Sequence, residues 1–145
     1  MTQTYGCPDL IVKGSAMHRL GVHTPVKADK YYAVDIKGSK IELKVGGGII
    51  NDYKMAGYKA QILIYTMCLN EMQNNHEDKK GFILGREYTF SSGCKFESHQ
   101  MLAGIDFEAD DKPYTHILPN AIEWHNWVDM YGNDPNAVYK KPEYM

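Results

Sequence analysis

The sequence contains few cysteines, little excess of either charge and no long hydrophobic run. Its three cysteines, Cys7, Cys68 and Cys94, form no C-x-x-C pair, so neither a disulfide framework nor a zinc knuckle is indicated, and we expect reduced thiols. The six histidines form no H-E-x-x-H motif. No stretch approaches the roughly 18 apolar residues of a membrane-spanning helix. These absences exclude a disulfide scaffold and a membrane-spanning chain.

The composition is that of one compact domain. The chain has 145 residues, of which 43% are hydrophobic and 23% are charged, and it carries no repeat or low-complexity run that would divide it. Its first residues have neither the basic nor the apolar region of a secretory signal. We therefore expect a single globular domain over residues 1–145, in an intracellular compartment and with no membrane partner.

Charge is distributed unevenly between the two halves of the chain. The formal net charge is -2, but residues 1–60 hold nine Lys and Arg against five Asp and Glu, whereas residues 61–145 hold seven against thirteen. A protein of this net charge is not expected to hold nucleic acid by its overall field alone. An anionic partner is expected at the N-terminal half, although the same pattern also fits charges that only solvate two faces.

Hydrophobic patterns predict several strands and one long helix. Residues 54–74 are apolar around most of the circumference of a helix, so we expect this helix to pack on more than one side. Gly38-Ser39 between two strand-like runs predicts a hairpin, and the path from it through the helix to the next strand predicts a βαβ-like crossover. The expected fold class is α/β (α+β), with a mixed sheet flanked by helices. The predicted strands are 9–13, 31–37, 40–45, 81–86, 88–90 and 102–107, and the predicted C-terminal helix is 120–131.

An acid-x-lysine step lies on one of the predicted strands. Asp35 and Lys37 are two residues apart, so they share a face of the strand, and the backbone carbonyl of Ile36 lies between them. Asp9 opens a neighbouring strand and would bring a second carboxylate to the end of the sheet. Hard divalent cations such as Mg²⁺ take oxygen ligands of this kind, usually one or two carboxylates completed by water and substrate phosphate. The sequence therefore indicates a candidate Mg²⁺ site.

The long helix carries a polar stripe. The spacing of Lys54, Tyr58, Gln61 and Tyr65 places them on one helix face. Polar side chains on a buried helix need partners, and an active-site cleft would supply them. Arg86, at the end of the strand after the helix, is a candidate phosphate contact because a guanidinium matches phosphate geometry.

Taken in order, these motifs resemble the PD-(D/E)XK nuclease superfamily. Pro8-Asp9, Asp35-Ile36-Lys37 and a Q-x-x-x-Y helix from Gln61 to Tyr65 match the RecB-like form of the superfamily in order and spacing. Other stretches are similar to YqaJ-type recombinase nucleases and to nucleases of large DNA viruses. The resemblance covers the chain from Tyr5 to about Trp127, and the further matching stretches are 58–61, 82–86 and 121–124.

The resemblance implies a restriction-endonuclease-like fold and Mg²⁺-dependent hydrolysis of DNA phosphodiester bonds, with Mn²⁺ as a substitute metal. An exonuclease of DNA recombination, repair or replication is typical of this branch, and its location would be the cytoplasm or the host-cell compartment of viral replication. Asp9 and Asp35 would ligate the metal together with the Ile36 carbonyl. Lys37 would orient or deprotonate the attacking water, and Gln61 and Tyr65 would point at the site. The nucleic-acid contacts would come from Lys54, Tyr58, Lys59 and Arg86.

Other interpretations of the same residues stay open. Asp35 and Lys37 also fit a solvated ion pair, and Asp9 also fits a stabilised turn after Pro8. Tyr58, Gln61 and Tyr65 also fit a set of core residues. Glu42 belongs to a second acid-x-lysine step and would lie opposite Asp35 across a two-residue hairpin, so it is a rival or third ligand.

The chain departs from the family pattern at its beginning. Family members carry a helix before the first strand, with an acidic residue that helps to bind metal, whereas only eight residues precede Asp9. The resemblance therefore implies an N-terminally truncated nuclease domain whose site a further protein chain or a second copy completes. The alternative function is a non-catalytic subunit that keeps the fold and binds DNA ends or has a structural role.

Overall fold

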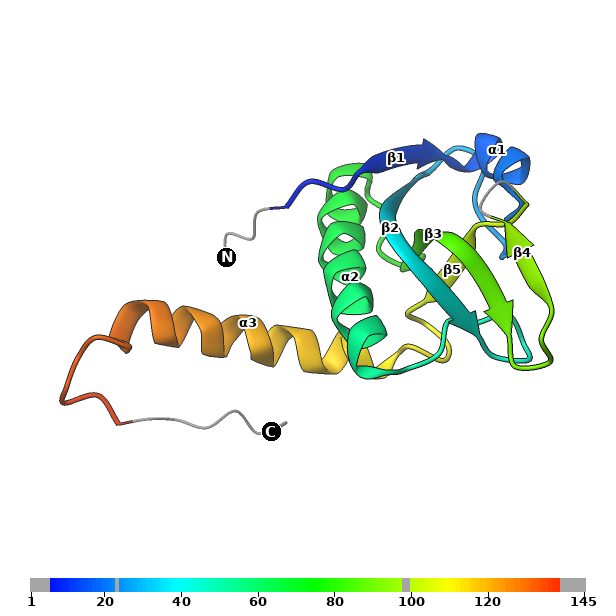
Figure 1. Ribbon diagram of the computed structural model, residues 1–145. Helices are drawn as coiled ribbons and strands as arrows, with labels where there is room; N and C mark the ends of the chain where they lie inside the picture. The colour runs from blue at the N-terminus through cyan, green and yellow to red at the C-terminus, as the bar shows by residue number, and fades with distance from the viewer. Residues whose placement is uncertain (1–5, 23, 98–99, 139–145) are drawn as a thin grey trace.

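The computed structural model describes residues 6–22, 24–97 and 100–138, and within them it shows an α+β fold. A mixed five-stranded sheet is flanked by helices, as the sequence predicts (Figure 1). The elements in chain order are β1 (Leu10–Lys13), α1 (Gly14–Met17), the 3-10 helix η1 (His18–Leu20), β2 (Tyr31–Leu43), α2 (Tyr53–Gln73), β3 (Lys80–Phe90), β4 (Lys95–Glu97), β5 (Ala103–Asp106) and α3 (Pro113–Tyr131).

Two long strands, β2 and β3, form the centre of the sheet. They run parallel, and α2 connects them, so the predicted βαβ-like crossover is confirmed. β1 pairs antiparallel with β2 at one side, while β4 and β5 both pair antiparallel with β3 at the other. The segment predicted as a separate edge strand at 88–90 is the end of β3, and the edge strand predicted at 102–107 is β5.

The predicted hairpin at Gly38-Ser39 is wrong. β2 runs without reversal through these two residues, and its pairing with β3 shifts by one residue between Lys37 and Lys40. Both halves of β2 find partners on β3, so the pair of small residues forms a bulge in a long strand instead of a turn. A hairpin here would have left one half of β2 without its parallel pairing to β3.

Glu42 therefore does not lie opposite Asp35. The two carboxylates are seven residues apart along one strand, and Glu42 is exposed and pairs with Thr89 on β3. Its expected role as a rival or third metal ligand depended on the hairpin and is wrong for this fold.

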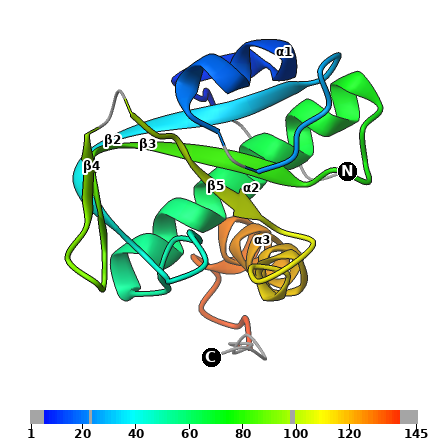
Figure 2. The same cartoon turned by 90° about the vertical axis from the view of Figure 1, so that its right-hand side faces the viewer.

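The sheet separates two hydrophobic clusters. One cluster lies between the sheet and α2 and includes Ile41, Ile62 and Ile83. The other lies on the opposite face, where Met17 of α1 packs with Val34 and Phe82. Figure 2 shows α1 and α2 on opposite sides of the central strands. Both faces of β3 are thus covered, as its nearly continuous apolar run predicts.

Helix α2 has clear start and stop signals and packs closely on β3. The Asp52 side chain accepts a hydrogen bond of 2.7 Å from the Met55 N–H, and the helix ends at Asn74 in the left-handed region with φ 52°. A Cβ on Gly81 would lie 2.1 Å from Cγ2 of Ile62, so only glycine permits this approach of strand and helix. The prediction of a helix over 54–74 is confirmed.

Helix α3 is longer than predicted and extends beyond the sheet. It begins at Pro113 and contains Pro119, where the sequence suggested a boundary. Tyr114, Leu118 and Ile122 of its first half pack on the core, whereas the second half runs past the end of α2, away from the strands (Figure 1). No helix within the described ranges is long and apolar enough to cross a membrane.

Candidate active site

The structure brings five of the predicted site residues together. Asp9 lies just before β1, Asp35 and Lys37 lie on β2, and Gln61 and Tyr65 lie on α2. Two hydrogen bonds join these elements. The bond from Ile36 to Asp9 spans 27 residues of sequence, and the bond from Lys37 to Gln61 spans 24. The resulting cluster, which we call the carboxylate site, consists of Asp9, Asp35, Lys37, Gln61 and Tyr65.

Strand alternation explains why Asp35 and Lys37 face the helix. Their partners on β3 are Ile83 and Gly85, and Ile83 packs in the cluster beneath α2. Paired residues of neighbouring strands point to the same face, so Asp35 and Lys37 point toward α2 as well. The acid-x-lysine step is therefore covered by the helix that carries the polar stripe.

Asp9 reaches the site through the backbone of β2. Its Oδ2 accepts a hydrogen bond of 2.7 Å from the Ile36 N–H. β1 pairs from Leu10 opposite Val34, so Asp9 stands one residue beyond the paired part of the strand. The N–H and C=O of one strand residue point to the same side, which places the Ile36 carbonyl on the same edge of β2 as Asp9. The alternative interpretation, in which Asp9 only stabilises the turn after Pro8, does not describe this contact.

Lys37 is held by a short chain of polar contacts. Its Nζ forms an ion pair with Asp35 and donates a hydrogen bond of 2.8 Å to Oε1 of Gln61. Nε2 of Gln61 donates in turn to the Tyr65 hydroxyl at 2.9 Å. Gln61 thus fixes the lysine head on one side and is itself oriented by Tyr65.

The two carboxylates differ in their electrostatics. Burial raises the pKa of Asp35, which is only 4% exposed, and the neighbouring Asp9 charge adds to this rise while Lys37 opposes it. The hydrogen bond from the Ile36 N–H, followed by a contact with Asp35, lowers the pKa of Asp9. A pair of close acids with opposite shifts is typical of functional sites, although ion-pair networks also produce it.

Lys54 and Tyr58 continue the site along α2. The Lys37 ammonium lies 4.6 Å from the centroid of the Tyr58 ring, and the Lys54 ammonium lies 5.8 Å from it. Nζ of Lys54 also donates a hydrogen bond of 2.7 Å to Oγ of Ser39 in the β2 bulge. The structure thus places Ser39 beside the site, a residue that the sequence suggested only as part of a turn.

Lys59 cannot contact DNA in this structure, so that expectation is wrong. Its side chain is fully buried, and its Nζ donates to the Ile49 carbonyl at 2.8 Å, to Oδ1 of Asn51 at 2.9 Å and to Oδ1 of Asp111 at 2.6 Å. One residue along a helix is a rotation of about 100°, which turns Lys59 away from the face of Tyr58.

Arg86 is exposed on β3 but lies apart from the carboxylate site in its interactions. The hydrogen bond from Lys40 lowers the pKa of Glu87, and burial acts in the opposite direction. The Arg86 charge adds a smaller lowering of the same pKa. Among the described residues, Arg86 forms no hydrogen bond or ion pair with Asp9, Asp35 or Lys37, so its role as a phosphate contact stays a prediction.

The carboxylate site has the donors that a hard cation needs. Two carboxylates and a backbone carbonyl supply oxygen ligands, and the buried Oδ2 of Asp35 is the atom that pairs with the Lys37 ammonium. Within the described ranges, no group of three or more His, Cys, Asp and Glu residues is placed to hold a metal. A cation held by the two carboxylates and the carbonyl would need water or phosphate in its remaining positions.

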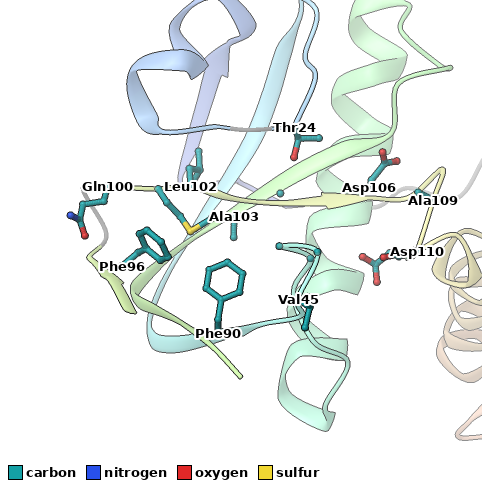
Figure 3. Close-up of a pocket in the computed structure, with 16 residues that line it drawn as sticks. Thr24, Val45, Phe90, Phe96, Gln100, Leu102, Ala103, Asp106, Ala109 and Asp110 are labelled. Carbon is teal, nitrogen blue, oxygen red and sulfur yellow. The ribbon is translucent and has the colours of Figure 1, made fainter. Parts of the chain in front are cut away.

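A hollow of about 470 Å³ lies elsewhere on the molecule (Figure 3). None of the residues of the carboxylate site lines it. Phe90 and Phe96 form one side, with ring centroids 5.7 Å apart, and Asp110 stands at another side. This hollow could not be predicted from the sequence, because its lining comes from separate strands and loops.

Comparison with known proteins does not identify the chain. No family model matches it, and neither a curated protein nor a solved structure matches it.

Proposed function

We propose that this chain catalyses Mg²⁺-dependent hydrolysis of phosphodiester bonds in DNA, as a nuclease of the PD-(D/E)XK type. One observation carries the proposal: Asp9 meets Asp35 and Lys37, which are distant from it in the sequence, beside Gln61 and Tyr65 of α2. The order of these motifs in the sequence supports it independently. Mn²⁺ has the same ligand preference and is the expected substitute metal.

Asp9 and Asp35 would hold the metal, with the Ile36 carbonyl as a third oxygen. A bound Mg²⁺ supplies Lewis-acid stabilisation of the phosphoryl charge and lowers the pKa of a water molecule. The hydrogen bond from the Ile36 N–H orients Asp9 and leaves its second oxygen available. Burial of Asp35 strengthens its attraction for a cation, because few water molecules compete in that position.

Lys37 would orient the attacking water as an ammonium, or accept its proton as a neutral amine; the ammonium form cannot ligate a metal. Gln61 keeps the lysine head beside Asp35, and the Tyr58 ring lies 4.6 Å from the ammonium and stabilises its charge. Lys54 would contact a neighbouring phosphate, and the exposed Tyr53 beside it offers a surface for a base. The basic N-terminal half of the sequence agrees with this direction of approach.

The decisive test is cleavage of linear and nicked DNA with and without Mg²⁺. The wild-type chain should cut in Mg²⁺ and stop when the metal is chelated, and Asp35→Ala should not cut. Persistent cleavage by Asp35→Ala would remove the proposal, because a contaminating nuclease or another site would then be responsible. Glu42→Ala is the matched control, since it removes an exposed carboxylate from the same strand and should leave cleavage unchanged.

A second candidate is a non-catalytic subunit that binds DNA ends, and the ion pair of Lys37 with Asp35 favours it. This contact neutralises the buried carboxylate without a metal. DNA binding without cleavage in Mg²⁺ or Mn²⁺ would select this candidate, in which a further chain or a second copy supplies the chemistry. Either candidate acts on DNA inside the cell, in agreement with the free Cys7, Cys68 and Cys94.

A further inference from the structure

The backbone at Gly6 lies directly against the ring of Tyr65. A Cβ at Gly6 would stand 2.4 Å from Cε1 of that ring and 3.1 Å from Cδ1. Contacts below about 3 Å do not occur between real carbon atoms, so the segment can cross the ring only because residue 6 has no side chain.

The ring of Tyr65 is fixed from two other sides. Its hydroxyl accepts the hydrogen bond from Gln61, and its body packs against the core cluster beneath α2. The segment before β1 is exposed at Gly6 and at Cys7. If a side chain at residue 6 met the Tyr65 ring, we expect the exposed segment to shift and the ring to keep its position.

A shift of this segment would also shift Asp9. Only Cys7 and Pro8 separate Gly6 from Asp9, and proline restricts the backbone between them. Among the described residues, the Asp9 carboxylate is held by the hydrogen bond from the Ile36 N–H and by its side-chain contact with Asp35. The position of its carboxylate therefore depends on where the chain crosses Tyr65.

We propose that Gly6 is a positioning residue for Asp9, and that Tyr65 has two separable tasks in the carboxylate site. Its ring seats the backbone at Gly6 and thereby places the Asp9 carboxylate. Its hydroxyl orients Gln61 and thereby places the Lys37 ammonium. The catalytic consequence rests on the proposed nuclease function, but the placement of Asp9 does not.

The first test reads the placement of Asp9 without any activity. Hydrogen exchange of the Ile36 amide, followed by NMR in the metal-free protein, reports its bond to Asp9. Gly6→Ala and Gly6→Val should speed this exchange about tenfold, the effect of losing one charge-assisted hydrogen bond. Gly46→Ala is the matched control, because a Cβ there meets nothing within 4 Å and should leave the exchange unchanged.

The second test is a double-mutant cycle with Tyr65. In the Tyr65→Ala background the ring is gone, so Gly6→Ala should have little further effect on Ile36 exchange. Equal effects in both backgrounds would overturn the inference, as would normal Ile36 protection in both Gly6→Ala and Gly6→Val. Because exchange is read at one amide against the rest of the sheet, a variant that merely unfolds is recognised by loss of protection everywhere.

The third test separates the two tasks of Tyr65. Gly6→Ala should weaken Mn²⁺ binding about tenfold by calorimetry, whereas Tyr65→Phe keeps the ring and should leave Mn²⁺ affinity within about twofold while lowering kcat for DNA cleavage. Loss of Mn²⁺ affinity in Tyr65→Phe would overturn the separation. If the wild-type chain neither binds Mn²⁺ nor cleaves DNA, the proposed function fails, and the exchange tests still decide the role of Gly6.

Discussion

Two lysine–aspartate pairs flank α2, and they differ in how completely their charges are satisfied. Lys59 and Asp111 meet at 2.6 Å, and the lysine side chain is 0% exposed, with three oxygen acceptors around its Nζ. Lys37 and Asp35 also form an ion pair, but the lysine side chain is 18% exposed, with Asp35 and Gln61 as acceptors and a ring beside it. The same two residue types thus occur in one closed and one open arrangement.

This difference means that Lys59 and Asp111 form a structural pair, whereas Lys37 and Asp35 can still bind a ligand. Lys59 joins α2 to the loop at Ile49 and to the start of α3, so all of its donors are used within the fold. At Asp35, the buried Oδ2 pairs with a lysine that is itself partly exposed, and a second carboxylate stands nearby. A buried charge with a complete set of partners supports the fold, whereas an incomplete set leaves interaction energy for a ligand.

The largest effect is expected from breaking the closed pair. Lys59→Ala leaves Asp111 buried without its cation and should reduce the free energy of unfolding by about 3–5 kcal/mol. Urea unfolding followed by circular dichroism measures it. Asp111→Asn combined with Lys59→Met removes both charges and should recover much of the loss. A Lys59→Ala protein as stable as the wild type would show that the pair contributes nothing to the fold.

Breaking the open pair should affect chemistry before stability. Lys37→Ala removes the group assigned to the attacking water and should lower the cleavage rate about a hundredfold or more. Mg²⁺ binding by calorimetry should change little, because an ammonium is not a metal ligand. Reduced metal affinity with an unchanged rate at saturating metal would contradict this assignment.

Asp78 provides an intermediate case, tested by pH. Burial acts to raise the pKa of this carboxyl, but hydrogen bonds from Tyr32 and Lys80 outweigh it and hold the pKa below its usual 3.8. The resulting stabilisation is present above that value and is lost as the pH falls through the lower, folded-state pKa. Tyr32→Phe should cost about 1.5–2 kcal/mol at pH 7.

The same Tyr32→Phe variant should cost less at a pH low enough to protonate Asp78 in the folded as well as the unfolded state. Unfolding curves of the variant and the wild type at the two pH values give the difference directly. A difference that does not shrink on acidification would mean that the Tyr32 hydroxyl does not act through the Asp78 charge.

The smallest effect is expected from the amide that holds the open pair. Gln61→Leu should lower the cleavage rate about tenfold, since Lys37 loses a hydrogen bond and Tyr65 its donor. Thermal melting should be unchanged or slightly higher, because leucine avoids the cost of burying an amide. A higher melting temperature with unchanged cleavage would remove Gln61 from the site.

Short-range periodicity made much of the carboxylate site predictable. Two residues along a strand and four along a helix share a face, so Asp35 with Lys37 and Gln61 with Tyr65 could be paired from the sequence. The length of α2 and its crossover to β3 followed from one long apolar segment. The resemblance to a nuclease family added the link between these pairs and Asp9.

Long-range pairing decided the features that could not be predicted. Gly38-Ser39 has the composition of a turn, and only the continuous partner β3 makes it a bulge. Lys59 has the composition of a surface residue, and its burial depends on Asp111, which is 52 residues away. Helix α3 extends through Pro119 because its first half packs on the core.

The bulge in β2 also restricts how this strand can vary in length. Before it, the strand places Asp35 and Lys37 beneath α2, and after it the strand sends Ile41 and Leu43 into the core. A single insertion or deletion between these stretches would exchange the buried positions with the exposed Lys40 and Glu42. The three residues between Lys37 and Ile41 therefore act as a spacer of fixed length, which tolerates substitution but not insertion or deletion.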